Sequence, residues 1–212
     1  MNLFERLCGR IYDRNEYSDT VTEPLKWTAL DLFEKLVPAR GDVLDCCCGS
    51  GVSTTKRLSE RYNVLAFDAS KRQVELCRKN APRAHVVQGF LGSIRLCYGY
   101  DGIVLANCLF NLSYRKQLQT LRLLRNHLYR QGVLLVSSYG DKTQMKFKRR
   151  WYGKPMVWYH LSDEAFEKML NKAGLVVQSR EMAVDRCGSQ AVYIWLCRRD
   201  DYMTTTITDQ WS

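Results

Sequence analysis

Residues 42–55 read DVLDCCCGSGVSTT, and this stretch decides the fold. The continuous apolar run Asp42–Cys46 is typical of a strand buried on both faces. Gly49 and Gly51 follow in a tight turn, and a helical pattern over Val52–Tyr62 begins directly after them. A strand, a glycine turn and a helix in this order allow the backbone to approach a nucleotide-like ligand. The stretch therefore predicts a binding loop at the carboxyl end of a parallel strand.

Similar apolar runs recur along the chain, and helical patterns separate them. The other expected strands are Asn63–Asp68, Ala84–Val87, Asp101–Ala106 and Gly132–Ser138. The expected helices are Thr22–Val37, Ser70–Asn80 and Ser113–Arg130. Alternation of this kind predicts an α/β fold, a Rossmann-like doubly wound and mostly parallel sheet covered by helices.

The last third of the chain has a different pattern. Asp141–Lys154 is basic and lacks periodicity, which predicts a long loop. Ser162 is placed to cap a helix that ends at Gly174. Leu175–Ser179 and Ala191–Cys197 predict an antiparallel C-terminal strand pair. We expect one domain over residues 1–198, with an N-terminal helical cap at 1–40, and a flexible tail over 199–212.

The spacing of Asp45, Gly49 and Gly51 resembles the D-x-G-x-G-x-G motif of class I methyltransferases that depend on S-adenosylmethionine. A dinucleotide motif, G-x-G-x-x-G, does not fit, because Cys47 and Val52 stand where glycines are needed. The resemblance covers nearly the whole chain. It includes Phe67–Ser70 (FDAS) after the second strand, Gln88–Phe90 (QGF), Tyr100–Asn107 (YDGIVLAN) and Leu161–Leu175.

The resemblance implies S-adenosylmethionine as cofactor, with an acidic residue after the second strand for its ribose hydroxyls. Asp68 stands there, and Gly89 and Phe90 stand where the family contacts the adenine. Tyr12 and Tyr17 correspond to N-terminal tyrosines that fold over the cofactor in similar enzymes. The residues expected to bind the cofactor are Tyr12, Asp45, Cys46, Cys47, Gly49, Gly51, Asp68, Ala69, Gly89, Phe90, Leu91, Asn107 and Cys108.

Two positions depart from the family pattern. Cys47 replaces the first glycine of the motif, which costs stability only if that backbone needs a positive φ. Phe90 replaces the acidic residue that usually follows Gly89, so stacking or a backbone amide is expected to hold the adenine instead. A non-catalytic partner protein that keeps the fold is the alternative these departures leave open.

His160 is the candidate catalytic base, because it precedes the late helix in a segment that borders the acceptor in this family. Oxygen and protonated nitrogen acceptors need such a base, whereas the methyl transfer itself needs mainly alignment. The segment 141–160 is therefore the expected acceptor-side loop, and its aromatic residues could line a pocket or pack in the core. They are Trp151, Tyr152, Trp158 and Tyr159. The favoured acceptor is a small molecule. Asn107–Phe110 (NCLF) is not the Asn-Pro-Pro-Tyr motif of amide-type methyltransferases.

The net charge of +10 comes almost entirely from one stretch. Residues 113–150 contain ten basic residues and only one acidic residue, Asp141, which gives +9. The basic residues are Arg115, Lys116, Arg122, Arg125, Arg130, Lys142, Lys146, Lys148, Arg149 and Arg150. Such a stretch is either a solvated face or a surface for a polyanion. An RNA methyltransferase is therefore the second functional hypothesis.

The nine cysteines predict free thiols rather than disulfides or a metal site. Cys46, Cys47 and Cys48 are contiguous, so alternate side chains of an extended strand point to opposite faces. The remaining cysteines show no spacing typical of zinc ligands. Reduced cysteines, and the lack of a signal-like or membrane-spanning apolar run, favour a cytoplasmic location.

Overall fold

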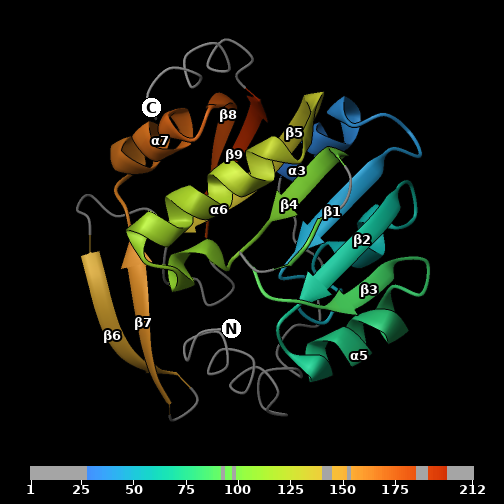
Figure 1. Cartoon of the computed structure of the whole chain (residues 1–212), viewed down its shortest axis with the longest axis horizontal. Coiled ribbons are helices and arrows are strands. Elements are labelled where there is room, and N and C mark those ends of the chain that lie inside the picture. Colours follow the sequence, from blue (N-terminus) through green and yellow to red (C-terminus); the bar gives the residue numbers. More distant parts are fainter. Residues whose placement is uncertain are drawn as a thin grey trace, which may run out of the picture.

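The computed structural model describes residues 28–91, 94–96, 99–139, 145–151, 154–184 and 191–199. Its centre is a seven-stranded sheet in the order β3-β2-β1-β4-β5-β9-β8 (Figure 1). The first five of these strands are parallel, and β9 and β8 join antiparallel. Their bounds are β1 Asp42–Cys46, β2 Asn63–Asp68, β3 His85–Gln88, β4 Tyr100–Leu105, β5 Leu128–Tyr139, β8 Leu175–Val184 and β9 Ala191–Arg199. The predicted Rossmann-like sheet with its antiparallel C-terminal pair is confirmed.

Helices cover both faces of the sheet, so most residues of its central strands are buried. On one face, α3 (Thr28–Leu36), α4 (Thr55–Leu58) and α5 (Lys71–Asn80) pack against side chains such as Val104 and Leu135. On the other face, α6 (Tyr114–Asn126) and α7 (Asp163–Lys172) pack against Leu134 and Trp195. Figure 1 shows α6 and α7 lying across the front of the sheet. None of the described helices is long and apolar enough to cross a membrane.

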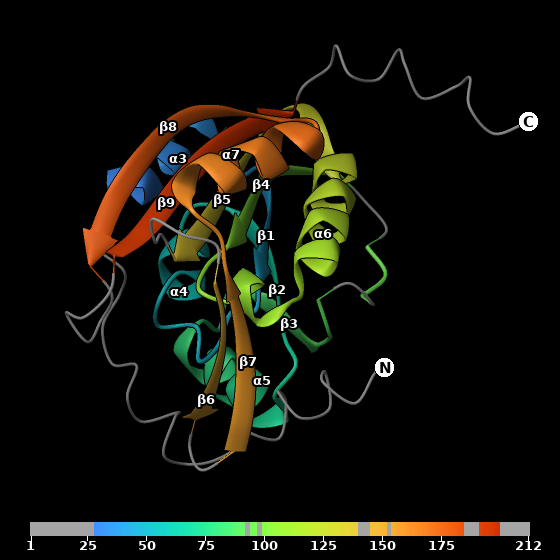
Figure 2. The ribbon, with the colours of Figure 1, turned by 90° about the vertical axis from the view of Figure 1, so that its left-hand side faces the viewer.

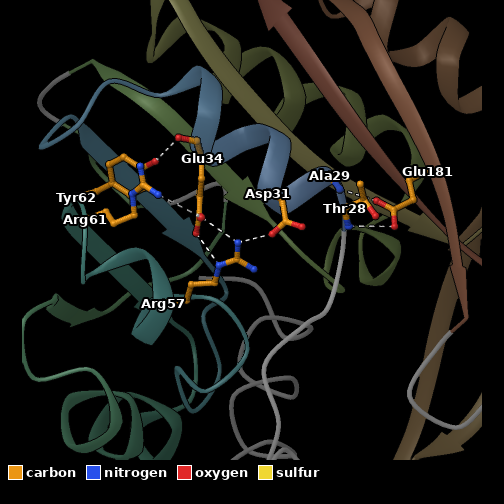
Figure 3. A network of polar contacts seen from close by, with 8 residues as sticks. All are labelled: Thr28, Ala29, Asp31, Glu34, Arg57, Arg61, Tyr62 and Glu181. Atoms are coloured by element: carbon orange, nitrogen blue, oxygen red, sulfur yellow. Dashed lines mark hydrogen bonds and ion pairs between the residues drawn. The ribbon is translucent and has the colours of Figure 1, made fainter.

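Polar contacts join α3 to β8, to α4 and to Tyr62, which follows α4 (Figure 3). The Glu181 carboxylate, from β8, accepts hydrogen bonds from the backbone N–H groups of Thr28 and Ala29. A negative charge at these otherwise unpaired N–H groups stabilises the start of a helix. Arg57 of α4 pairs with Glu34 and Asp31 on the side of α3. Because α4 follows the glycine turn directly, this pair also fixes the position of that turn.

Two helices are shorter than the sequence pattern predicts. The helix expected over Val52–Tyr62 is regular only from Thr55 to Leu58, because the preceding residues continue the turn. The helix expected over Ser113–Arg130 ends at Asn126, and Leu128 already belongs to β5. Leu128 is 2% exposed and pairs with Tyr100 of β4, so its apolar side chain packs in the core as part of the sheet rather than of the helix. The predicted tail is also one residue shorter, since Arg199 lies in β9.

The long loop expected over Asp141–Lys154 is wrong for residues 145–151. These residues form β6 (Met145–Trp151), which pairs antiparallel with β7 (Lys154–His160) in a separate two-stranded sheet. The sequence alternates as a strand should, with Met145, Phe147 and Trp151 in odd positions. Arg149 interrupts that alternation, and Lys146, Lys148 and Arg150 at the even positions make the segment strongly basic. The pattern therefore resembled a polar loop. Figure 2 shows this hairpin running away from α7 as an arm beside the main sheet.

Three predicted helix ends are confirmed in detail. Ser70 accepts a hydrogen bond from the Gln73 N–H at the start of α5, and Ser162 accepts one from the Ala165 N–H at the start of α7. Gly174 follows α7 with φ +78°, the left-handed conformation typical of a helix end.

Candidate functional site

The turn after β1 has three residues in the left-handed region of φ. Cys47 has φ +57°, Gly49 φ +57° and Gly51 φ +79°. Two glycines adopt this conformation without a steric penalty, whereas a residue with a Cβ does so at a cost of about 1–2 kcal/mol. The condition under which Cys47 costs stability is therefore met. Gly51 is needed for a second reason, because a Cβ there would lie 2.6 Å from the Cys77 Sγ atom.

Asp45 is a buried acid whose side-chain hydrogen bonds hold the turn after β1 in place. Its side chain is 1% exposed, and one carboxylate oxygen, Oδ2, accepts hydrogen bonds of 2.7 Å from both Thr54 and Thr55. Burial raises the pKa of Asp45 to about 6, although the two hydroxyl donors partly oppose this shift. The acid therefore links the end of β1 to the start of α4, with the turn closed between them.

Asp68, at the end of β2, joins three segments of the site. Its Oδ2 atom accepts from the Gly49 N–H at 3.0 Å, and its Oδ1 atom accepts from the Ser70 N–H at 2.9 Å. Its carbonyl oxygen accepts from the Gly89 N–H, after β3, at 3.0 Å. Each carboxylate oxygen can accept a further bond, so the group can still receive ribose hydroxyls. The acid thus aligns both neighbouring loops.

The turn is open on the side of Gly49. A Cβ at this residue would meet only the Gln73 side-chain oxygen, at 3.8 Å. Open space beside a left-handed glycine, next to a buried acid on the adjacent strand, fits the nucleoside part of a cofactor. Ala69 lies directly after β2, and Phe90 and Leu91 lie after β3, so the expected adenine contacts are at the same edge of the sheet.

The residues after β4 complete this edge. Asn107 has φ +54°, and its N–H donates to the Ser137 hydroxyl of β5 at 2.7 Å. The Cys108 thiol lies beside the Cys47 thiol, so the loops after β1 and β4 approach each other through these side chains. Burial raises the pKa of Cys108, and burial together with the Cys108 contact raises the pKa of Cys47. These cysteines are therefore neutral packing groups rather than reactive thiolates.

The six cysteines on which the structure gives information are free. A second thiol contact joins Cys48, in the turn, to Cys77 of α5, and with burial it raises the pKa of Cys48. Across the described residues, no cluster of three or more His, Cys, Asp or Glu side chains is placed to hold a metal ion.

Four aromatic rings gather where β4 and β5 end. Phe110 lies in η1 (Leu109–Asn111), after β4, and meets the rings of Tyr139, Trp158 and His160 edge-on. Tyr139 ends β5 and stacks on the His160 ring at 5.2 Å between centroids. His160 is 6% exposed, whereas the other three rings are half-buried. We call Phe110, Tyr139, Trp158 and His160 the aromatic cluster.

Two side chains of α6 attach the hairpin to this position. The Gln117 side-chain amide, 2% exposed, donates to the carbonyl oxygens of Leu112 and Tyr159 at 2.9 and 3.0 Å. The Tyr114 hydroxyl donates to the His160 carbonyl oxygen at 3.2 Å. The end of β7 is thereby held against the loop that follows β4, which brings the aromatic cluster together.

The structure brings most of the predicted site residues to one edge of the sheet. The loop residues Asp45–Gly51 lie there with Asp68, Ala69, Gly89, Phe90, Leu91, Asn107 and Cys108, and His160 lies in the aromatic cluster beside them. Tyr12, Tyr17 and Tyr152 lie outside the described residues. Sequence reasoning missed Thr54, Thr55, Ser137 and Gln117, as well as Phe110 and Tyr139. The available signal for the last two was that Phe110 lies in the segment that follows β4 and that Tyr139 ends β5.

Comparison with known proteins supports the same interpretation. Residues 43–132 match the family model described as a methyltransferase domain. No curated protein matches the chain in sequence. Among solved structures, the fold is similar to the 1,6-didemethyltoxoflavin-N1-methyltransferase of Burkholderia thailandensis, crystallised with 1,6-didemethyltoxoflavin and S-adenosylhomocysteine. That likeness has a TM-score of 0.74 and 15% identity over 94% of this chain and 88% of that chain.

Two further structures have similar folds. A methyltransferase of Clostridium acetobutylicum that depends on S-adenosylmethionine has a TM-score of 0.68, with 13% identity over 93% of this chain and 99% of that chain. One from Methanosarcina mazei has a TM-score of 0.67, with 13% identity over 79% of this chain and 96% of that chain. The strand order and the turn after β1 agree with the family match, which describes a methyltransferase domain over residues 43–132.

Proposed function

We propose that the chain transfers the methyl group of S-adenosylmethionine to a small molecule held beside the aromatic cluster. The observation that carries this proposal is the cluster itself, where three half-buried rings and the buried His160 meet at the ends of β4 and β5. Aromatic faces and edges bind planar or apolar molecules through offset and edge-to-face contacts. A planar, largely apolar acceptor fits these groups.

The proposed cofactor position uses the edge already described. Asp68 would receive the ribose hydroxyls, Gly49 would allow close approach of the backbone, and Phe90 would stack on the adenine. Asn107 and Cys108 would border the reacting end, since they lie between the turn after β1 and the aromatic cluster. The sulfonium of the bound cofactor supplies an electrophilic methyl group. The side chains of this chain then have to align the acceptor and exclude water.

His160 is the residue we propose as the base for an oxygen or protonated nitrogen acceptor. Its ring is fixed on two sides, by the stacked Tyr139 and by the edge of Phe110. Its backbone is fixed by Tyr114. A histidine held in this way can take a proton from the acceptor as the new bond forms, which is the role a general base needs.

The similar fold of the Burkholderia enzyme offers a parallel, because its bound 1,6-didemethyltoxoflavin is a small molecule. At 15% identity the parallel supports the class of acceptor and not its identity. A cytoplasmic location remains part of the same proposal.

Label transfer tests the proposal directly. The protein is incubated with methyl-labelled cofactor and either an ultrafiltered small-molecule extract or purified RNA. We expect label in the small-molecule fraction and none in RNA; label in RNA alone would refute a small acceptor. The variant Phe110→Leu should lower this transfer at least about tenfold, because the acceptor loses an aromatic contact. Tyr129→Leu, at an exposed aromatic on β5, is the control and should leave transfer unchanged.

A further inference from the structure

The β6–β7 hairpin has two faces of different character. Cross-strand pairs share a face, and Lys148 pairs with Val157, Lys146 with Tyr159, and Arg150 with Pro155. The pairs between them place Met156, Trp158 and His160 on the opposite face. Met156 and His160 are buried and Trp158 contacts Phe110, so this second face is turned to the domain. We call the face with Lys146, Lys148 and Arg150 the outer face.

The outer face has a row of exposed positive charges. Lys146, Lys148 and Arg150 are all exposed, and successive members are two residues apart along β6. Residues 145–160 contain no aspartate or glutamate. Within the part of the chain that the structure describes, no carboxylate forms an ion pair with any of the three. Their charge is therefore available to a partner in solution.

An aromatic pair lies beside this row. The Lys146 ammonium group is 5.6 Å from the centroid of the Tyr159 ring. The Tyr114 ring, at the start of α6, meets the same ring nearly perpendicularly at 5.3 Å. Both tyrosines are half-buried, so part of each residue remains accessible to solvent. A cation row with partly exposed aromatic rings is the combination that proteins use to bind single-stranded nucleic acid.

We propose that the outer face of the β6–β7 hairpin binds single-stranded nucleic acid through its phosphates. Two residues of a strand span about 6.6–6.8 Å, which is about twice the 3.4 Å rise per nucleotide in a stacked strand. Adjacent phosphates of one strand lie farther apart than this axial rise, because the backbone winds around the axis. Successive cations are therefore spaced to contact successive phosphates, and Tyr159 offers a surface for a base. A membrane surface fits less well, because insertion needs exposed apolar side chains. Those identified in the described part, Tyr129, Val176 and Met182, all lie outside the hairpin.

This binding surface is separate from the proposed acceptor position. The cations point away from the aromatic cluster, because they occupy the opposite face of the same two strands. The inference therefore does not depend on the acceptor being a small molecule. Binding at the outer face would hold the protein on a polyanion and would leave the proposed cofactor edge unobstructed.

Fluorescence anisotropy with a labelled single-stranded RNA of mixed sequence tests the proposal. The triple variant Lys146→Gln, Lys148→Gln, Arg150→Gln is compared with Lys35→Gln, Lys79→Gln, Lys172→Gln. The second set removes the same charge from exposed sites on α3, α5 and α7. Losing three phosphate contacts should reduce the slope of log affinity against log salt by about 2. We expect affinity to fall at least about tenfold at about 150 mM salt.

The control set should change affinity less than about twofold, because it tests only net charge. Equal loss in both sets, or none in either, would overturn the proposal and leave the cations as protection of an open edge strand. Binding to phosphatidylserine vesicles with no binding to RNA would also overturn it, in favour of a membrane surface. Thermal unfolding and binding of S-adenosylhomocysteine, unchanged in the hairpin variant, confirm that the domain stays folded.

Discussion

The two sides of the site are built in different ways. The proposed cofactor side consists of turns that follow β1, β2 and β3. Asp68 accepts there from the backbone N–H groups of Gly49 and Ser70, and Asp45 accepts from the hydroxyls of Thr54 and Thr55. The proposed acceptor side depends on a hairpin outside the main sheet, and α6 holds that hairpin through Gln117 and Tyr114. On the proposed cofactor side, these hydrogen bonds restrict both where the turns lie and which residues can form them. The proposed acceptor side is attached at a few points, so its position depends on fewer groups.

The largest expected effect concerns Asp45 and the pH dependence of stability. Its pKa is about 6 in the folded chain against an ordinary 3.8, so the folded state binds more protons in this range. The free energy of unfolding therefore falls as pH rises from about 4 to about 6, by up to about 3 kcal/mol from this group. In Asp45→Asn this contribution is absent. The difference in stability between variant and wild type should rise with pH over that window and level off above it.

Urea unfolding at several pH values measures this difference. A constant offset between the two proteins is expected from the altered bonds to Thr54 and Thr55, and only the change with pH tests the buried charge. A flat difference between pH 4 and 6 would show that Asp45 titrates normally, and the contrast between the two sides would lose its main support.

The next effect is on cofactor affinity. In Asp68→Asn, the side-chain NH₂ group would face either the Gly49 or the Ser70 N–H, where only an acceptor fits. Losing this charged acceptor should weaken binding of S-adenosylhomocysteine about a hundredfold, or about 2.7 kcal/mol. Calorimetry measures the affinity. Asp42→Asn removes the same charge at the exposed start of β1 and should bind normally; equal weakening in both would count against the assigned role.

A third change tests the attachment of the hairpin. Gln117→Leu removes the donor to two carbonyl oxygens and should lower the free energy of unfolding by about 2 kcal/mol. Hydrogen exchange of the β7 amides should speed up, while affinity for S-adenosylhomocysteine stays the same. Gln119→Leu lies on the exposed side of the same helix and should change neither quantity. Weaker cofactor binding in Gln117→Leu would mean that the two sides are not independent.

The smallest effect is expected at Cys47. In Cys47→Gly, relief of the left-handed backbone is opposed by the greater entropy of glycine in the unfolded chain. Stability should stay unchanged or rise by up to about 1 kcal/mol. Cys46→Gly, one residue earlier in the extended and buried strand, should instead lower it by about 2 kcal/mol. Thermal unfolding compares the two, and an equal loss in both would show that the Cys47–Cys108 contact outweighs the strain.

The same contrast explains which features could be predicted from sequence. Asp45, Gly49, Gly51 and Asp68 were identifiable because their roles depend on backbone conformation and on spacing along the chain. The aromatic cluster was harder, because its rings come from η1, β5 and β7 and meet only in three dimensions. The hairpin was missed because Arg149 breaks an alternation that is otherwise present. Gln117 gave no signal, since a buried glutamine on a basic helix resembles any surface residue.

The separate hairpin has a consequence for how this enzyme can change over time. In the described residues, β6 and β7 share no backbone pairing with the seven-stranded sheet. Residues 145–160 could therefore be lengthened, shortened or exchanged for the corresponding segment of a related enzyme without shifting the register of any other strand. Changes in this one short stretch would then alter Trp158 and His160 of the aromatic cluster, while Phe110, Tyr139 and the proposed cofactor edge stay the same. Natural diversification and laboratory grafting would both begin at this hairpin.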